Sequence, residues 1–245
     1  MLSKSQVKYI QSLHHKKFRD LEGAFIAEGN KLVLELLQSG RFVCEQLLGE
    51  QEWLHDNEIL IRKHFAGDLQ EVKDFELQKV STLSTASQVL AVFKKIQPKE
   101  IVVKDRVTLL LDTIQDPGNL GTIIRIADWF GIAAIICSGD TVDQYNPKVV
   151  QSTMGSLARV NIMYTDLQKF IRSNNKIKIY ADALKGKDIS TLKGLKEGFI
   201  LIGNESKGIS AELMEAATEK ITIPKIGSAE SLNAAVATGI ILSHL

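Results

Sequence analysis

Three polar segments of the chain bring together side chains that could do chemistry: residues 112–121, 203–208 and 223–233. Each is rich in glycine or small residues, and each follows an apolar run typical of a buried parallel strand. Ligands of open α/β sheets bind beyond the carboxyl ends of the strands. The three segments together therefore predict one composite binding site, which no single segment would establish.

Nucleotide-redox and metal chemistry are not indicated. The chain contains no GxGxxG sequence and no phosphate-loop lysine, and Gly118 and Gly121 are too few glycines for close approach to a pyrophosphate. Its five histidines form no i, i+4 ligand pair. Cys44 and Cys137 lie far apart without CxxC spacing. This pattern predicts no metal site and a reducing, cytoplasmic location.

The elements that must position these segments alternate between strands and helices. Such alternation predicts the α/β class with a parallel sheet. The expected strands are 107–112, 132–137, 177–181, 198–202 and 220–223. A helix is expected over 122–130, and a buried helix is expected from a cap near Ser231 to the end of the chain.

Composition favours a soluble globular protein with more than one domain. The 245 residues are 44% hydrophobic and 24% charged, and this length is comfortable for two domains. No apolar run approaches the roughly 20 residues that span a bilayer. A charged, proline-bearing stretch predicts a linker over 95–106, between a small α/β domain over 1–94 and a second domain over 107–245.

A basic cluster near the N-terminus, Lys16, Lys17 and Arg19, could contact RNA phosphates. The net charge of +1 does not by itself indicate a polyanionic partner, so this interpretation depends on the local cluster alone. The alternative is a solvated helix face without a partner.

Several segments resemble one known family. Asp116-Pro-Gly-Asn-Leu-Gly-Thr-Ile-Ile-Arg-Ile-Ala-Asp-Trp-Phe-Gly131 is similar to the first motif of the SpoU (TrmH) RNA ribose 2′-O-methyltransferases. Gly203-Asn-Glu-Ser-Lys-Gly-Ile-Ser210 resembles the second motif, and the segment ending in Ser231-Leu-Asn233 resembles the third. Gln151-Ser-Thr-Met-Gly-Ser156 also matches the family. The first half, with Phe25-Ile-Ala-Glu-Gly29, resembles an L30e-like substrate-binding domain.

The resemblance implies a C-terminal domain with a deep trefoil knot, an obligate homodimer, and S-adenosylmethionine (AdoMet) as cofactor. Backbone groups of Gly203, Ile223 and Leu232 would hold the adenine edge. Leu201 and Ile223 would flank the ring, and Asn233 would order the third segment. Pockets of this kind are mostly apolar, with a few convergent polar groups.

The resemblance also assigns catalytic roles. Arg125 would grip a phosphate, orient the ribose hydroxyl and stabilise developing negative charge, because a free arginine stays protonated and is therefore a poor general base. Asn119 would position Arg125 or the ribose, while Glu205 and Ser231 would complete the hydrogen-bond network and Asn233, also counted in the catalytic set, would order the third segment. The alternatives are a surface ion pair for Arg125 and a helix cap for Glu205.

The expected function is transfer of a methyl group from AdoMet to a ribose 2′-hydroxyl of structured RNA, with ribosomal RNA favoured over transfer RNA. The alternative from a different class is an inactive RNA- or ribosome-binding protein that keeps the fold. The joint presence of the five residues Asn119, Arg125, Glu205, Ser231 and Asn233 argues against that alternative, because a pure binder does not need them.

Overall fold

The computed structural model describes all 245 residues. The chain forms two compact α/β units. The first unit contains Met1–Gln97 and Asp143–Arg159, and the second contains Pro98–Val142 and Val160–Leu245. The first unit is therefore discontinuous, since it includes a segment from the middle of the chain. The domain boundaries at 94 and 106 stay a prediction. No helix has the length and apolar character needed to cross a bilayer.

The first unit is built on a four-stranded sheet with strand order β1-β4-β2-β3. β4 pairs antiparallel with both β1 and β2, and β2 pairs parallel with β3. Its elements in chain order are α1 (Lys4–Ser12), α2 (Lys16–Glu22), β1 (Ala24–Glu28), α3 (Asn30–Gln38), β2 (Cys44–Gly49), α4 (Gln51–Asp56), α5 (Glu58–His64), β3 (Asp68–Glu71), α6 (Asp74–Val80), β4 (Val89–Lys94), α8 (Pro147–Thr153) and the 3₁₀ turn η1 (Ser156–Ala158).

Both faces of this sheet are covered. α1 and α6 pack against one face, in a core that includes Ile10, Leu77 and Leu90. α3 and α8 contact β1, and an aromatic group gathers Phe25, Phe42, Phe93 and Tyr145. The Tyr145 ring comes from the inserted segment and lies 4.7 Å from the Phe25 ring. The segment 143–159 therefore contributes to the hydrophobic core of the first unit.

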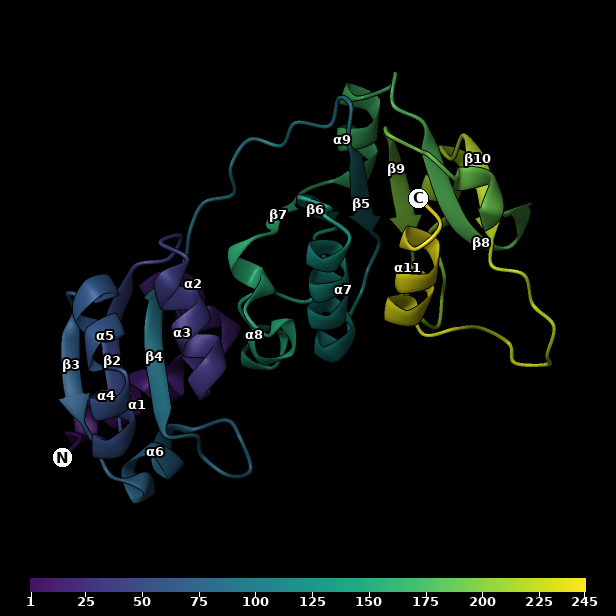
Figure 1. The fold of residues 1–245 in the computed structure, drawn as a ribbon. Coiled ribbons are helices and arrows are strands. Elements are labelled where there is room, and N and C mark those ends of the chain that lie inside the picture. Colours follow the sequence, from purple (N-terminus) through teal and green to yellow (C-terminus); the bar gives the residue numbers. More distant parts are fainter. The chain divides into compact units, whose positions relative to one another are not determined.

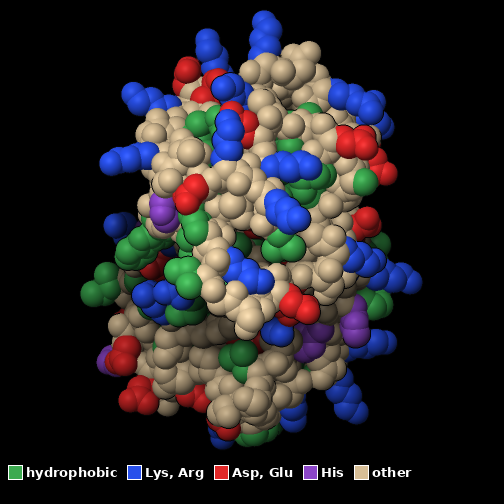
Figure 2. All heavy atoms as spheres, turned by 90° about the vertical axis from the view of Figure 1, so that its right-hand side faces the viewer, with side chains coloured by type: hydrophobic (Ala, Val, Ile, Leu, Met, Phe, Trp, Pro, Cys, Tyr) green, Lys and Arg blue, Asp and Glu red, His purple; other side chains and the backbone are tan.

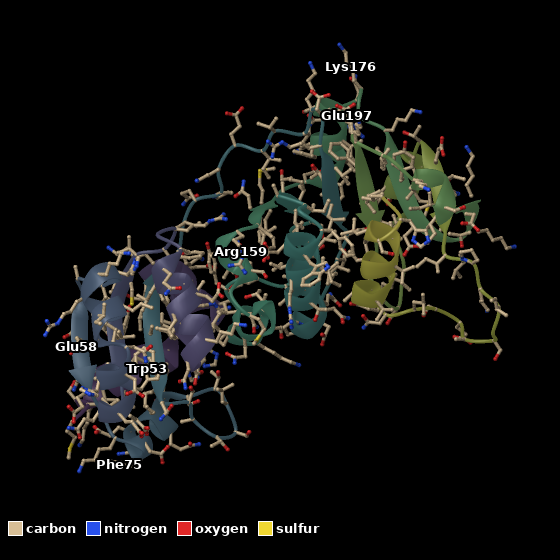
Figure 3. The ribbon with its side chains drawn as sticks, in the orientation of Figure 1. Trp53, Glu58, Phe75, Arg159, Lys176 and Glu197 are labelled. Carbon is tan, nitrogen blue, oxygen red and sulfur yellow. The ribbon has the colours of Figure 1, made fainter.

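Ion pairs also fasten this segment. Arg19 Nη2 lies 2.7 Å from Asp143 Oδ2, and the Arg19 side chain is almost fully buried. The same guanidinium donates to the carbonyl oxygens of Leu13 and His14. Near the other end of the segment, Arg159, which is labelled in Figure 3, forms a second ion pair. Its Nη1 lies 2.9 Å from Glu35 Oε2. Because a buried charge is costly without a partner, the Arg19–Asp143 pair makes the docking of this segment specific.

The second unit holds a six-stranded, fully parallel sheet with strand order β10-β8-β9-β5-β6-β7 (Figure 1). This confirms the predicted α/β class with a parallel sheet, whereas the knot stays a prediction. The elements are β5 (Val107–Leu111), α7 (Pro117–Trp129), β6 (Ala134–Cys137), β7 (Asn161–Tyr164), α9 (Leu167–Ser173), β8 (Ile179–Asp188), the 3₁₀ turn η2 (Ile189–Leu192), β9 (Gly198–Ile202), α10 (Ala211–Glu215), β10 (Glu219–Thr222) and α11 (Ala234–Leu242).

Helices cover the two faces of this sheet. α9 and α10 enclose a core with Leu110, Phe199 and Leu201. α7 and α11 pack against each other (Figure 1). Their contact is close, because a Cβ added at Gly239 of α11 would lie 3.5 Å from Ile126 Cδ1 of α7. The helix pair brings the first motif beside the end of the chain.

Two helix starts differ from those predicted. α7 begins at Pro117 rather than at 122, because Asp116 caps it and proline suits the first helical position. α11 begins at Ala234 and its cap is Asn233, not Ser231. β7 is not among the predicted strands. In both helices the capping residue belongs to a family motif, so motif and helix start share the same residues.

Candidate active site

The first turn of α7 is fixed by Asp116. Its Oδ1 accepts a hydrogen bond from the Asn119 backbone N–H at 2.8 Å. A Cβ added at Gly118 would lie 2.9 Å from the same carboxylate oxygen. Glycine is therefore the residue that fits beside this cap. The cap fixes the first turn of α7 and thereby the direction in which the Asn119 side chain points.

Asn119 joins the other two motif segments. Its Nδ2 donates to Glu205 Oε1 at 2.5 Å. Its Oδ1 accepts from Asn233 Nδ2 at 2.8 Å. The amide side chain of Asn119 thus connects Glu205 through its N–H and Asn233 through its oxygen, although all three residues are distant in sequence. The three segments predicted to form one composite site are thus connected by the network Glu205–Asn119–Asn233.

Asn233 also caps a helix. Its Oδ1 accepts hydrogen bonds from the backbone N–H groups of Ala235 and Val236, at 2.9 and 3.3 Å. It therefore caps α11 with one atom and takes part in the network with the other. Glu205, in contrast, caps no helix, since the N-cap of α10 is Ser210. The Glu205 carboxylate lies in the network instead.

Arg125 lies further along α7, with an exposed side chain. It takes part in no ion pair of the structure, which describes the whole chain. A surface ion pair, the alternative for this residue, is not formed. The guanidinium is open to an incoming anionic group. Ser231 is also exposed, but no hydrogen bond connects it to Asn119, Glu205 or Asn233.

The second motif requires a glycine at its start. A Cβ added at Gly203 would lie 2.3 Å from the Gly208 carbonyl carbon, far inside van der Waals contact. The loop closes on itself through paired backbone hydrogen bonds between Asn204 and Gly208, at 3.0 and 2.8 Å. This tight turn lies at the carboxyl end of β9.

The remaining cofactor candidates fall into two groups. Ile223 is half-buried and Leu232 is exposed, so both can meet a ligand. Leu201 is fully buried in the core with Phe199 and Leu213. Its side chain packs in the core of the sheet, and the roles of Leu201 and Ile223 beside an adenine ring stay predictions.

These residues fit AdoMet. The turn at Gly203 admits no side chain, because the Gly208 backbone occupies that space, and exposed apolar side chains occur at Leu184, Ile226 and Leu232. On the side of the molecule that carries β8 and β10, hydrophobic side chains lie among lysines and arginines (Figure 2). Apolar surface with convergent backbone groups suits an adenosyl ligand.

Asp182 is a charged group of this unit that sequence reasoning missed. It follows Ala181, the last residue of β8 that pairs with β9 before the strand bulges. Burial raises the pKa of its carboxyl to about 6. The signal is available in the sequence, because Asp182 directly follows an apolar run, as Asp112 does.

The basic cluster of the first unit is divided by the structure. Lys16 and Lys17 are exposed. Lys16 pairs with Asp20 at 2.6 Å on the surface, and such exposed pairs are weak. Arg19 is 1% exposed and is paired with Asp143. Lys16 and Lys17 are thus exposed while Arg19 is packed inside the first unit, and RNA contact by the cluster stays a prediction.

Comparison with known proteins covers both halves of the chain. Residues 106–243 match the SpoU rRNA Methylase family, and residues 4–91 match the MRM3-like substrate binding domain. The chain is 32% identical to the 23S rRNA (guanosine(2553)-2'-O)-methyltransferase RlmP of Bacillus subtilis, over 98% of this chain and 95% of that protein.

Solved structures of rRNA and SpoU methyltransferases are also similar to this chain. An AdoMet-bound rRNA methyltransferase from Sinorhizobium meliloti superposes with a TM-score of 0.85 at 32% identity, covering 100% of this chain and 95% of that one. The SpoU methyltransferase AviRb from Streptomyces viridochromogenes shares the fold, with a TM-score of 0.87 at 23% identity over 99% and 97% of the two chains.

These matches confirm three expectations from the sequence: the family resemblance, an RNA 2′-O-methyltransferase activity and AdoMet as cofactor. They extend over nearly the whole chain, in agreement with the order of the three motifs. The chain belongs to the SpoU rRNA methylase family.

Proposed function

We propose that this enzyme transfers the methyl group of AdoMet to a ribose 2′-hydroxyl of ribosomal RNA, with Asn119, Arg125, Glu205, Ser231 and Asn233 as its catalytic set. The observation that carries the proposal is the Glu205–Asn119–Asn233 network, in which three motif segments meet through two short hydrogen bonds. The names of its relatives support ribosomal RNA as the substrate class.

AdoMet supplies an electrophilic methyl group. The protein must bind and orient the ribose 2′-hydroxyl that attacks this group and stabilise the charge that develops on its oxygen. Arg125 is the residue for an anionic group, because its guanidinium is exposed and lacks a protein partner. It grips the phosphate next to the target ribose and offsets negative charge developing on the 2′-oxygen. The network around Asn119 holds the three segments in register while this happens. Ser231 is exposed beside Leu232 on the third segment, where its hydroxyl is free to meet the substrate.

The alternative function is an inactive RNA-binding protein, which would keep the fold but would not need the catalytic residues. Mass-spectrometric mapping of ribose methylation in ribosomal RNA from a deletion strain and its parent tests the activity directly, and one missing 2′-O-methyl group is expected. Calorimetric titration with AdoMet tests the alternative of an inactive binding protein, because a protein without catalysis has no need to bind the cofactor. An unchanged methylation map together with no AdoMet binding would favour the binder.

The enzyme is proposed to work as a homodimer through α7 and α11. Trp129, at the end of α7, is 85% exposed, and Val236 on α11 is half exposed. Exposed aromatic and aliphatic side chains on two helices that pack together form a surface suited to a second copy.

Trp129→Glu is expected to shift the protein from dimer to monomer and to abolish most activity, because a carboxylate in an apolar interface has no partner. Light scattering coupled to size-exclusion chromatography measures the change. Ile59→Glu, at an 87% exposed apolar residue of α5, is the matched control and should leave the dimer intact. A wild-type enzyme that is monomeric and fully active would contradict the proposal.

The first unit is proposed to bind RNA through Lys16 and Lys17. Replacing both with glutamate should reduce the slope of log affinity against log salt by about one unit for every phosphate that the variant no longer neutralises. Filter binding of ribosomal RNA fragments over a salt series measures the slope. The control replaces two exposed lysines before β8 with glutamate, Lys178 and Lys176, of which Lys176 is labelled in Figure 3. Equal slopes in both double variants would show that the α2 lysines are only a solvated face.

A further inference from the structure

A buried carboxylate next to the active site has no role in the mechanism above. Asp112 follows β5 and is 6% exposed. Its Oδ2 accepts a hydrogen bond from the Ser210 backbone N–H at 2.8 Å, and its Oδ1 accepts from the Thr113 hydroxyl at 3.0 Å. Ser210 is the last residue of the second motif. Asp112 therefore ties the far end of that motif to the neighbouring strand.

Thr113 ties the near end. Its φ of 58° lies in the left-handed region, which is unusual for a β-branched residue. In this conformation its carbonyl oxygen accepts from Asn204 Nδ2 at 2.8 Å, and its N–H donates to Ser138 Oγ at 2.8 Å. Backbone strain of this kind persists only when surrounding contacts impose it, and it gathers at functional sites.

Between these two ties the loop is held by its own hydrogen bonds. Asn204 Oδ1 accepts from the N–H groups of Ser206 and Lys207, at 2.9 and 3.0 Å. Glu205 lies between the tied residues Asn204 and Ser210. Its carboxylate reaches Asn119 at 2.5 Å, so the position of this carboxylate depends on where the loop is held.

We propose that Asp112 and Thr113 are positioning residues, which clamp the loop 203–210 at both ends and thereby hold Glu205 in the network with Asn119. The carboxylate of Asp112 acts on the Ser210 amide, and the backbone of Thr113 acts on Asn204. The catalytic consequence rests on the function proposed above, whereas the clamp itself can be tested without any activity.

Asp112→Ala and Asp112→Asn separate positioning from folding. Alanine leaves the Ser210 N–H without its acceptor, whereas asparagine keeps an acceptor oxygen and can donate to the Thr113 hydroxyl. In Asp112→Ala, hydrogen exchange of the Ser210 amide and of 204–208 should accelerate about tenfold, since hydrogen bonds to charged groups are worth that much or more. The kcat should fall about tenfold at saturating AdoMet and RNA, and asparagine should restore most of both.

Asn204→Asp tests the other tie, because it keeps the acceptor for Ser206 and Lys207 but loses the donor to Thr113. Faster exchange of 204–208 and a lower kcat are expected again. Asp166→Ala is the matched control for Asp112→Ala, because the Asp166 carboxylate accepts from the Lys169 backbone N–H at the start of α9, outside the clamp. Its exchange in 204–208 and its kcat should stay near wild type.

The outcomes divide as follows. Unchanged exchange in Asp112→Ala and Asn204→Asp overturns the clamp. Faster exchange with unchanged kcat overturns the positioning role and leaves the proposed function standing. A uniform rise of exchange through β5 and β9, not restored by asparagine, shows that Asp112 only stabilises the fold, and this also overturns the proposal.

Discussion

Arg125→Ala is expected to lower kcat by on the order of 100-fold or more, roughly 3 kcal/mol, while AdoMet affinity stays close to wild type. The exposed guanidinium forms no hydrogen bond with the network residues, so its removal should not disturb the fold or the cofactor segments. The substitution removes a positioned cation from the place where negative charge develops. Single-turnover kinetics with saturating AdoMet measures the rate, and calorimetry measures the affinity.

Arg125→Lys separates two versions of this role. Lysine keeps the charge but loses the planar fork that can grip a phosphate through two parallel hydrogen bonds. A severe defect in Arg125→Lys would favour geometric gripping, and a mild one would favour charge alone. Arg172→Ala, at an exposed arginine of α9, is the control and should behave as wild type. If Arg125→Ala methylates RNA at a near-normal rate, the catalytic role belongs to Glu205 or Ser231.

Asn233→Asp should lower kcat/KM by about tenfold or more and weaken AdoMet binding, yet leave thermal stability at or above wild type. Aspartate can still accept the hydrogen bonds of Ala235 and Val236, and its negative charge is favourable at a helix N-terminus. It cannot donate to Asn119 Oδ1. Two facing acceptor oxygens would repel each other and separate the third segment from the first.

Asn233→Ala gives the complementary result. It removes both the cap and the donor, so it should reduce stability by about 1 kcal/mol in addition to reducing the activity. Asn146→Asp is the matched control, because Asn146 caps α8 in the same way and lies outside the network. Thermal denaturation and AdoMet titration together measure both effects. Full activity in Asn233→Asp would show that the residue serves only as a helix cap.

If the proposed clamp acts on the network, we expect the site to tolerate little change in loop geometry. Glu205 is held by Asn119, and its loop is tied by Asp112 and Thr113. Asn233 in turn depends on the start of α11. A displacement at any of these points is transmitted to the others through short hydrogen bonds, and a small misplacement of reacting groups is costly in rate.

The family motifs make much of the site predictable. Asn119, Glu205 and Asn233 can be named from the sequence because each occupies a fixed place in a motif that follows a strand. The strands themselves are visible as apolar runs, since parallel strands are buried on both faces. The helix starts are misplaced by a few residues, because capping depends on which side chain turns back to the backbone.

Other features of these residues depend on tertiary contacts that the sequence does not show. Arg19 is part of a basic cluster in the sequence, but its partner Asp143 lies far along the chain and is reached only when the inserted segment docks. Leu201 is predicted to flank the cofactor, and only the structure shows that its side chain on β9 lies in the core. The sequence shows that a residue is charged or apolar. It does not show which distant residue will pair with that charge or bury that apolar side chain.

What the sequence determined alone is therefore the class of fold, the order of the strand-end segments and the identity of the candidate reacting side chains. These follow from local periodicity and from short motifs, in which residues a few positions apart share a face or a turn. Only the tertiary structure decided that Asn119 bridges Glu205 and Asn233, that Asp112 and Thr113 contact the second motif, and that residues 143–159 fold with the first unit. Such contacts join residues far apart in the chain, and they are set by the register of the parallel sheet and by burial, neither of which a local pattern contains.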